Sequence, residues 1–295
     1  MKSRMLLNLL LLALVVGLGL FAYLRPRQAS QPEFALSATP PADVHRIAIA
    51  PQDQPTVKLE KRGREWFVAA PFRTRADAFK VEQILGVLGA RSKERLAATD
   101  LARFGLDKPL LTLTLERQVF RFGGFSPISQ KQYVGDGNWV YLVDPRYFAA
   151  AAAPAADYAS KQLLAAGDIP VGFDFPALKL TRVRGRWSAN PARPELDQDR
   201  LNQFAQEWQL ASGLVTQPYS GGKTLEHILL HLSDGRGIPI AVLGRKPELV
   251  LLREDENMEY HFPAQMGARL LDPARGSADG AEVGRGADRR GAAPA

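Results

Sequence analysis

The chain has 295 residues, a formal net charge of +7 and no cysteine. The lack of cysteine excludes disulfides, thiolate zinc sites, cysteine nucleophiles and lipoprotein attachment through a cysteine. Four basic residues flank an apolar segment near the amino terminus, and without them the net charge is only +3. The other charges are interspersed, whereas polynucleotide binding needs basic residues clustered on one face. We therefore expect no nucleic-acid partner.

Residues 5–24 form an apolar run in which Asn8 is the only strongly polar residue. A helix of this length spans about 30 Å, the thickness of the hydrocarbon core of a bilayer. We expect a transmembrane helix here that acts as a signal anchor. Residues 1–4 would be cytoplasmic, and the bulk of the chain would be extracytoplasmic, in the periplasm if the source is Gram-negative. A cleaved signal peptide is the alternative, but it would have a shorter apolar core and a small-x-small cleavage site.

The remaining sequence divides into four predicted segments. Residues 25–42, rich in Pro, Ser, Ala and Gln, are typical of a linker. Residues 43–166 predict a first α+β repeat that ends in a helical connector, and residues 167–272 predict a second α+β repeat. Residues 273–295, composed mainly of Gly, Ala and Arg, predict a disordered tail.

The case for an internal duplication is a shared order of patterns at a spacing near 120 residues. Each copy starts with a hairpin pattern, over residues 57–71 and 178–191. A helix with an apolar stripe follows, preceded by Asp77 in the first copy and by Asp197 and Asp199 in the second as candidate caps. The two stripes consist of Val81, Ile84, Leu85 and Leu88, and of Leu201, Phe204, Ala205 and Trp208.

The later parts of the copies also match. An alternating strand at residues 111–115 corresponds to one at residues 228–232, and an Asp-x-Asn turn with a following tyrosine recurs at residues 136–141 and 255–260. Because the strands alternate apolar and polar residues, they predict antiparallel sheets covered by helices on one face, not a doubly wound parallel sheet. Residues 149–164 are expected to form the helical connector.

Two patterns suggest ligand sites but have a simpler explanation. His227 and His231 would share one face of a helix, as metal ligands do, but the residues between them alternate as in a strand, which would separate the two rings by about 13 Å. Gly222, Lys223 and Thr224 resemble the end of a phosphate-binding loop. However, the earlier glycine of that motif is absent, and a strand follows where the motif needs a helix.

No other pattern indicates catalysis. Asp255 and Glu256 lie at a predicted turn in polar surroundings, where nothing would raise a carboxyl pKa. Trp139 is a candidate for an exposed glycan or peptide contact, whereas Trp66 and Trp187 are expected to pack the helices on the sheets. We assign no catalytic, cofactor-binding or metal-binding residue and expect no cofactor.

Residues 101–109, with the sequence LARFGLDKP, the turn at residues 63–66 and residues 157–164 resemble the domain of unknown function 4340 family. The likeness extends from the anchor to about Asp272, and residues 104–109 are its most specific part. It implies a membrane-anchored bacterial protein without an assigned activity, and family members are often found in gene neighbourhoods of ABC-type export systems. The second copy has no obvious counterpart of residues 104–109.

The sequence thus leads to two functional hypotheses. The first is a single-span envelope protein whose non-catalytic ectodomain binds a protein partner, such as a component of an ABC transporter. The alternative is an exported hydrolase or ligand-binding enzyme with a site between the two repeats. An enzyme should have a deep cleft where polar side chains converge, and a binding module should have an apolar surface patch.

Overall fold

The computed structural model describes residues 11–21 and 32–275. Residues 11–21 are helical. Across the described ranges, none of the helices combines the length and the apolarity needed to cross a bilayer. The rest of the predicted span, residues 5–10 and 22–24, lies outside the described residues, as do residues 276–295 of the predicted tail.

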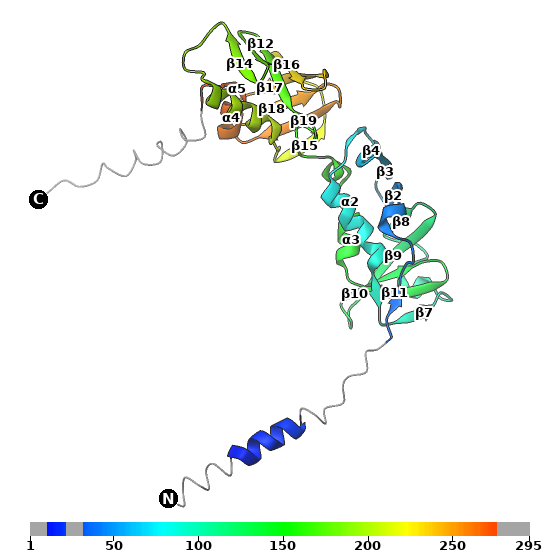
Figure 1. The fold of residues 1–295 in the computed structure, drawn as a ribbon. Helices are drawn as coiled ribbons and strands as arrows, with labels where there is room; N and C mark the ends of the chain where they lie inside the picture. Colours follow the sequence, from blue (N-terminus) through cyan, green and yellow to red (C-terminus); the bar gives the residue numbers. More distant parts are fainter. Residues whose placement is uncertain (1–10, 22–31, 276–295) are drawn as a thin grey trace, which may run out of the picture.

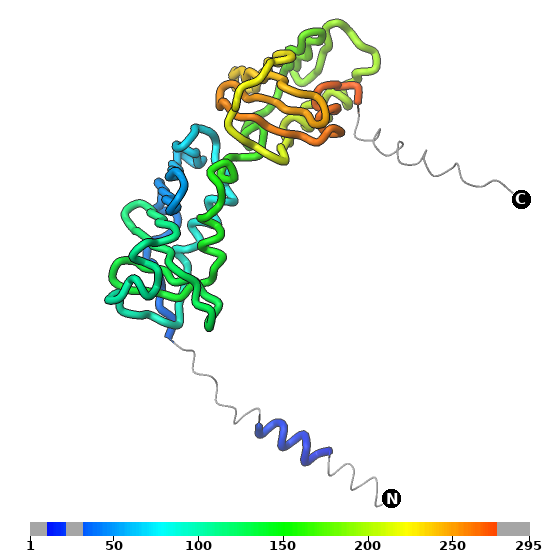
Figure 2. Tube along the Cα trace, turned by 180° about the vertical axis from the view of Figure 1, so that it is seen from behind, coloured from blue at the N-terminus to red at the C-terminus, as the bar shows by residue number. Residues whose placement is uncertain are grey.

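Residues 34–158 form a first unit and residues 167–275 a second, joined by a connector over residues 159–166 (Figures 1 and 2). Each unit is a mixed α/β body in which helices cover one face of an antiparallel sheet. The two sheets are separate, and each has its own hydrophobic core. The antiparallel α+β prediction is therefore confirmed at this level.

The first unit contains a nine-stranded sheet in the order β5-β4-β3-β2-β8-β9-β10-β11-β7 and a separate two-stranded pair, β1 with β6. Its strands are β1 (Phe34–Ala35), β2 (Arg46–Pro51), β3 (Val57–Arg62), β4 (Glu65–Ala70), β5 (Thr74–Arg75), β6 (Arg91–Ser92), β7 (Arg95–Ala97), β8 (Leu111–Leu115), β9 (Gln118–Ser126), β10 (Lys131–Gly135) and β11 (Trp139–Val143). The helices are α2 (Ala78–Leu85) and α3 (Arg146–Ala151), with short 3-10 helices η1 (Pro41–Asp43), η2 (Gly86–Gly89), η3 (Ala102–Phe104) and η4 (Ala155–Tyr158).

The second unit contains an eight-stranded sheet in the order β14-β13-β12-β16-β17-β18-β19-β15. Its strands are β12 (Pro170–Phe175), β13 (Leu178–Val183), β14 (Arg186–Asn190), β15 (Val215–Pro218), β16 (Glu226–Leu232), β17 (Gly237–Gly244), β18 (Leu249–Arg253) and β19 (Met258–Phe262). The helices are α4 (Gln198–Gln209) and α5 (Ala264–Leu271). Apart from β5, each strand of the first sheet has a counterpart at the same position in the second sheet, from β4 and β14 to β7 and β15.

The predicted helices form where their capping residues and apolar stripes place them. The Asp77 carboxylate accepts the backbone N–H groups of Phe79 and Lys80 at the start of α2, and Asp197 accepts that of Arg200 at the start of α4. Such caps satisfy backbone donors that have no partner within the helix. The stripes of both helices are buried against their sheets, and Trp208 also donates its indole N–H to the Leu270 carbonyl of α5.

Two predicted segments differ from the structure. Residues 34–36 of the predicted linker belong to the first unit, because β1 pairs with β6 and Leu36 is buried. The predicted helical connector is helical only in α3 and η4, and residues 159–164 contain no helix but isolated bridges at Ala159 and Gln162. Its alanine run predicts a helix locally, but the later residues find backbone partners in both units, as described below.

Residues 101–109 cross the outer face of the first sheet, opposite its helices. Phe104 and Leu106 pack there on Val140, in a small third core. Gly105 has φ of 66°, a left-handed conformation in which glycine is favoured, and it lets the chain turn after η3. Gly123 and Gly124 form a bulge in β9 below this segment, and a Cβ on Gly123 would overlap the Phe104 carbonyl oxygen. In the second unit the crossing at the corresponding place is made by residues 219–225.

Candidate functional site

Side chains and backbone groups of both units meet at the junction between them. The connector is hydrogen-bonded to both units there. On the first unit, Ser160 donates its backbone N–H to the Arg75 carbonyl, at 2.8 Å. On the second, Leu163 donates to the Ala211 carbonyl at 2.8 Å, and Gly213 donates back to Lys161 at 2.9 Å. The connector thus continues the hydrogen bonding of both units and has no unpaired central stretch.

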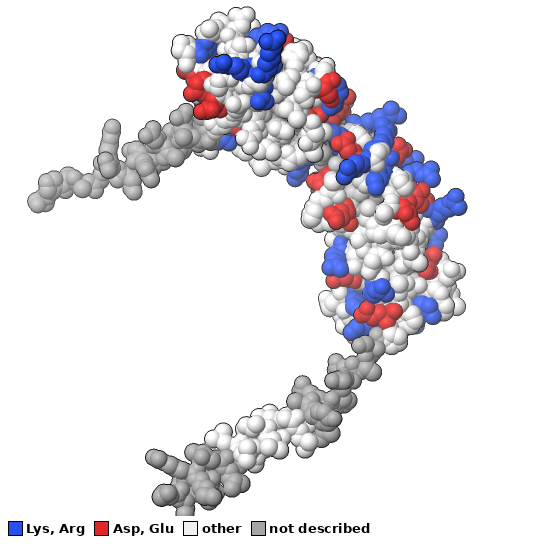
Figure 3. All heavy atoms as spheres, in the orientation of Figure 1, with Lys and Arg blue, Asp and Glu red and all other residues white. Residues whose placement is uncertain are grey.

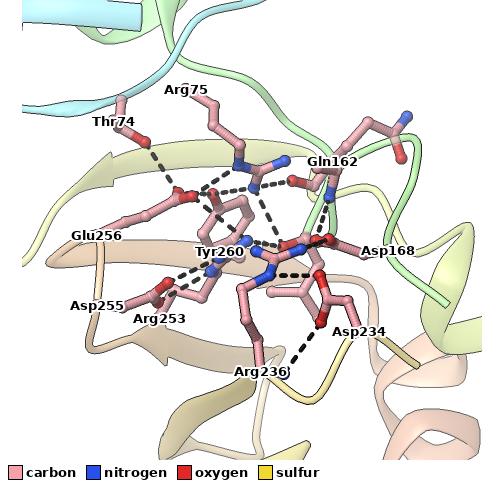
Figure 4. A network of polar contacts seen from close by, with 12 residues as sticks. Thr74, Arg75, Gln162, Asp168, Asp234, Arg236, Arg253, Asp255, Glu256 and Tyr260 are labelled. Carbon is pink, nitrogen blue, oxygen red and sulfur yellow. Dashed lines mark hydrogen bonds and ion pairs between the residues drawn. The ribbon is translucent and has the colours of Figure 1, made fainter. Parts of the chain in front are cut away.

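An aromatic side chain links the two hydrophobic cores. Phe72 lies in the loop between β4 and β5 of the first unit and packs against buried residues of both units. Burial of apolar surface favours this contact by about 25 cal/mol for each Å² removed from water. Strand β5, which follows this loop, places two polar side chains, Thr74 and Arg75, against the second unit (Figure 4).

Glu256, in the turn between β18 and β19, is the central acceptor of the junction. It accepts the Arg75 Nε–H at 2.6 Å, the Thr74 hydroxyl at 3.0 Å and the Tyr260 hydroxyl at 2.9 Å. The Arg75 and Glu256 side chains are only 12% and 11% exposed. Ion pairs this deeply buried need such additional hydrogen bonds, because each charge loses its water.

Arg75 and Arg253 also bind the connector backbone. Arg75 Nη2 donates to the carbonyls of Gln162 and Leu163, and Arg253 Nη1 donates to that of Leu163 at 2.7 Å. The Nε and Nη2 atoms of Arg253 form a bidentate ion pair with the Asp255 carboxylate. Burial lowers the pKa of Arg253, but the hydrogen bonds and charges of its acidic neighbours outweigh this effect and raise it overall.

A cavity of about 320 Å³ lies beside this network, between the units. At its second-unit side the buried Asp168 pairs with Arg236 at 2.5 Å, and Arg236 also pairs with Asp234 at 2.7 Å. These bonds raise the pKa of Arg236. The cavity is lined by Glu65, Phe67, Arg75, Ala165, Gly167, Asp168, Arg236, Arg253 and Glu256.

The basic groups that line the cavity are all paired. Each of its three guanidinium groups has a carboxylate partner within 2.7 Å. The Tyr260 hydroxyl donates to Glu256, and burial first, then the Glu256 charge, raises its pKa. This arrangement favours the neutral form of the Tyr260 phenol. The hydrogen bonds of Arg75 and Thr74 to Glu256 join the two units at this place.

A larger open hollow of about 910 Å³ lies on the first unit around the turn between β8 and β9. Its carboxylate Glu116 accepts the backbone N–H groups of His45 and Arg46, and these bonds hold its pKa below the ordinary value. Glu116, which lines the hollow together with Asp43 and Glu60, is therefore already committed to the backbone.

His227 and His231, the two histidines considered as metal ligands, lie on β16, as the alternation indicated. Their rings pair with different carboxylates, His227 with Glu254 at 3.3 Å and His231 with Asp174 at 3.0 Å. Burial raises the pKa of Asp174, but hydrogen bonds from His231 and Lys179 lower it overall. The structure does not bring the two histidines to a common ligand position.

The glycine-rich residues 221–224 lie in the loop that crosses the second sheet, and a strand follows them, not a helix. The preceding Ser220 donates its backbone N–H to Glu259, which also accepts from the Gln217 amide. Burial raises the pKa of Glu259, but these hydrogen bonds and the neighbouring His261 lower it overall. The loop therefore binds a carboxylate of its own chain and does not form a phosphate cradle.

The tryptophans divide as predicted between packing and exposure. Trp66 and Trp187 are buried against the helices. Trp139 is 37% exposed, and the Arg95 guanidinium lies 4.2 Å from the centre of its ring. The prediction of a glycan or peptide contact at Trp139 stays a prediction.

The burial of Glu256 was not predicted. Glu256 lies at a turn among polar groups, as the sequence indicated, but these groups come from both units and its side chain is only 11% exposed. The role of Arg75 was also missed. Neither residue has a local signal, because each is an ordinary charged residue until the two units are placed together.

Comparison with known proteins places these features in a family. The family model described as domain of unknown function (DUF4340) matches residues 66–219, just over half of the chain. The chain belongs to this family. The match runs from Trp66 in β4 through the loop between β4 and β5 and the connector to Tyr219, just after β15. No curated protein and no solved structure matches the chain.

Proposed function

We propose that this DUF4340 member is a single-span protein of the cell envelope whose non-catalytic ectodomain binds a protein partner, a component of an ABC-type transport system. Residues 5–24 would be the anchor, with the bulk of the chain on the extracytoplasmic side. The length and apolarity of that segment support the anchor. The assignment of the partner rests on the family resemblance.

We further propose that the two units arose by internal duplication. The shared strand order of the two sheets and the matching hairpins, capped helices and Asp-x-Asn turns support this origin. After duplication, the chemistry of the copies would have diverged. Residues 101–109 cross the first sheet with apolar side chains, whereas the shorter crossing in the second unit binds the carboxylate of Glu259.

The observation that supports a binding role most directly is the compensation of charge at the junction. The residues that converge there satisfy one another and fix the two units, as a scaffold for recognition requires. On the face drawn in Figure 3, acidic and basic side chains also lie on both units. This face thus carries both signs of charge and no large field of a single sign.

The test is fractionation followed by affinity purification of the tagged full-length protein from membranes solubilised in mild detergent, with mass spectrometry. The proposal predicts that the protein fractionates with the membrane and recovers the same transporter component in repeated experiments. Recovery of the protein alone, or its presence in the soluble cytosolic fraction, would contradict the proposal.

A second candidate, an exported hydrolase or ligand-binding enzyme with a site between the repeats, is favoured by the cavity of about 320 Å³ at that place. An enzyme of this kind should lose its activity when Arg236 is replaced by Ala, because Arg236 lines the cavity and is 58% exposed. Profiling of the purified protein against ester, glycoside and phosphoester substrates would decide the matter. Turnover that R236A abolishes would replace the binding proposal.

A further inference from the structure

The edge strands of the two large sheets differ in whether other parts of the chain cover their backbone groups. An edge strand has unpaired backbone groups that can bind another strand, so proteins usually cover it. At one edge of the first sheet, the connector pairs with β5 and the residue after it, through Ser160 and the bridge between Ala76 and Ala159. At one edge of the second sheet, η4 lies beside β15. The contacts that cover β5 and β15 thus both lie at the junction between the units.

The edge at β14 is covered at Trp187 by a side chain. Gln198, the first residue of α4, accepts the backbone N–H of Trp187 through its amide oxygen and donates its amide nitrogen to the Trp187 carbonyl, both at 2.8 Å. The amide group thus occupies the place that the backbone of another strand would take. Of the four edge strands of the two large sheets, β5, β14 and β15 thus have such contacts, and the fourth is β7.

The backbone pattern shows which groups of β7 are open. Trp139 accepts a hydrogen bond from the Asp136 N–H within the β10–β11 hairpin, so the next residue, Val140, directs its backbone groups toward β7. Val140 is opposite Leu96. Leu96 therefore pairs with the sheet, and Arg95 and Ala97 direct their backbone groups outward. Within the described ranges, no backbone group is bonded to these outward groups.

The side chains next to this edge have a definite chemistry on each face. On one face, Arg95 lies between two aromatic rings, with its guanidinium 4.5 Å from the centre of Phe34 and 4.2 Å from that of Trp139. On the other face, Leu96 packs with the apolar cluster of Phe104 and Val140. A strand added at β7 would therefore place alternate side chains beside a cation flanked by aromatic rings and beside an apolar surface.

We propose that β7 is the docking edge of this protein, at which an extended segment of a protein partner adds as a further strand of the first sheet. The segment alternates acidic residues, which face Arg95, with apolar residues, which face Leu96. Such strand addition takes its affinity from backbone hydrogen bonds and its specificity from alternate side chains. The inference deepens the proposed function and depends on it for the existence of a partner.

The test uses random linear peptides displayed on phage, selected against the full-length protein in lipid nanodiscs. The proposal predicts selected peptides with alternating acidic and apolar residues. Their binding should weaken at least about tenfold in A97P, because proline removes the outward N–H of Ala97 without breaking a bond to β11. A97P should keep the thermal midpoint of the wild type. In R95E the peptides should also bind less tightly, because the cation that faces their acidic residues is reversed.

Two readouts separate strand addition from other binding. N-methylation of the peptide backbone should abolish binding at alternate positions only, and the amide exchange of Arg95 and Ala97 should slow when peptide binds. Selected peptides that bind A97P as well as the wild type would overturn the proposal, as would a library that yields no binder or self-association of the protein through β7. If the partner copurifies equally with A97P, the docking edge is wrong and the proposed function stands. If nothing copurifies with the wild type, the proposed function itself fails.

Discussion

Replacement of Glu256 by alanine tests the junction at its most connected residue. The substitution leaves Arg75, Thr74 and Tyr260 without their shared acceptor, and the Arg75 side chain is only 12% exposed. Removal of one partner of a buried ion pair costs about 3–5 kcal/mol, because the remaining charge is desolvated and unpaired. Both side chains are nearly buried, so screening by solvent should reduce this value little.

The matched control is Glu254→Ala in the same turn. Glu254 pairs with His227, whose side chain is 68% exposed, and exposed pairs contribute below about 1 kcal/mol. The assay is urea unfolding of the full-length protein in mild detergent, followed by tryptophan fluorescence. We expect E256A to be destabilised several-fold more than E254A, with Glu256→Gln between them because it keeps one acceptor oxygen. Equal and small losses in E256A and E254A would refute the assignment of Glu256 as the buried centre of the junction.

Local contacts elsewhere in the protein lead to three more expected outcomes. Gly123→Ala should cost about 1–3 kcal/mol in urea unfolding, because its Cβ meets backbone, whereas Gly89→Ala, in open space, should change stability by less. Gln198→Ala should speed the amide exchange of Trp187 and cost about 1–2 kcal/mol, and unchanged exchange would show that the edge is covered in another way. Glu259 has a folded-state pKa below its ordinary value of 4.5, so its contribution to stability is present above that pH and is lost as the pH falls through the folded pKa. Glu259→Gln should therefore flatten the loss of stability below about pH 4.5 in acid titrations, and an unchanged slope would contradict this.

Much of each unit could be predicted because its signals are local. A cap such as Asp77 or Asp197 and an apolar stripe define a helix within about ten residues, and a glycine turn between alternating strands defines a hairpin. The sheets follow from these elements, since antiparallel neighbours are mostly adjacent in the chain. Residues 104–109 were identified as distinctive, but the small core that they form over the first sheet was not predicted. A segment without regular secondary structure has no hydrophobic periodicity that would show which face of a sheet it covers.

The junction could not be predicted from the sequence. Arg75 and Glu256 are 181 residues apart, and a charged residue in a turn is normally exposed. The connector posed a related problem, because its alanine-rich start favours a helix while its later residues pair with both units. In both cases the contacts between units determine the structure, and one sequence contains no pattern for them.

The measurement that tests the account most directly is the distribution of distances between the two units. Because the chain has no cysteine, spin labels can be placed at Glu82→Cys on α2 and Gln206→Cys on α4, both exposed, without removing native thiols. Double electron–electron resonance on the full-length protein in nanodiscs should give a single narrow distribution, which broadens when Glu256→Ala is added. A broad or multiple distribution without that substitution would contradict the claim that the buried charges at the junction hold the two units as one scaffold.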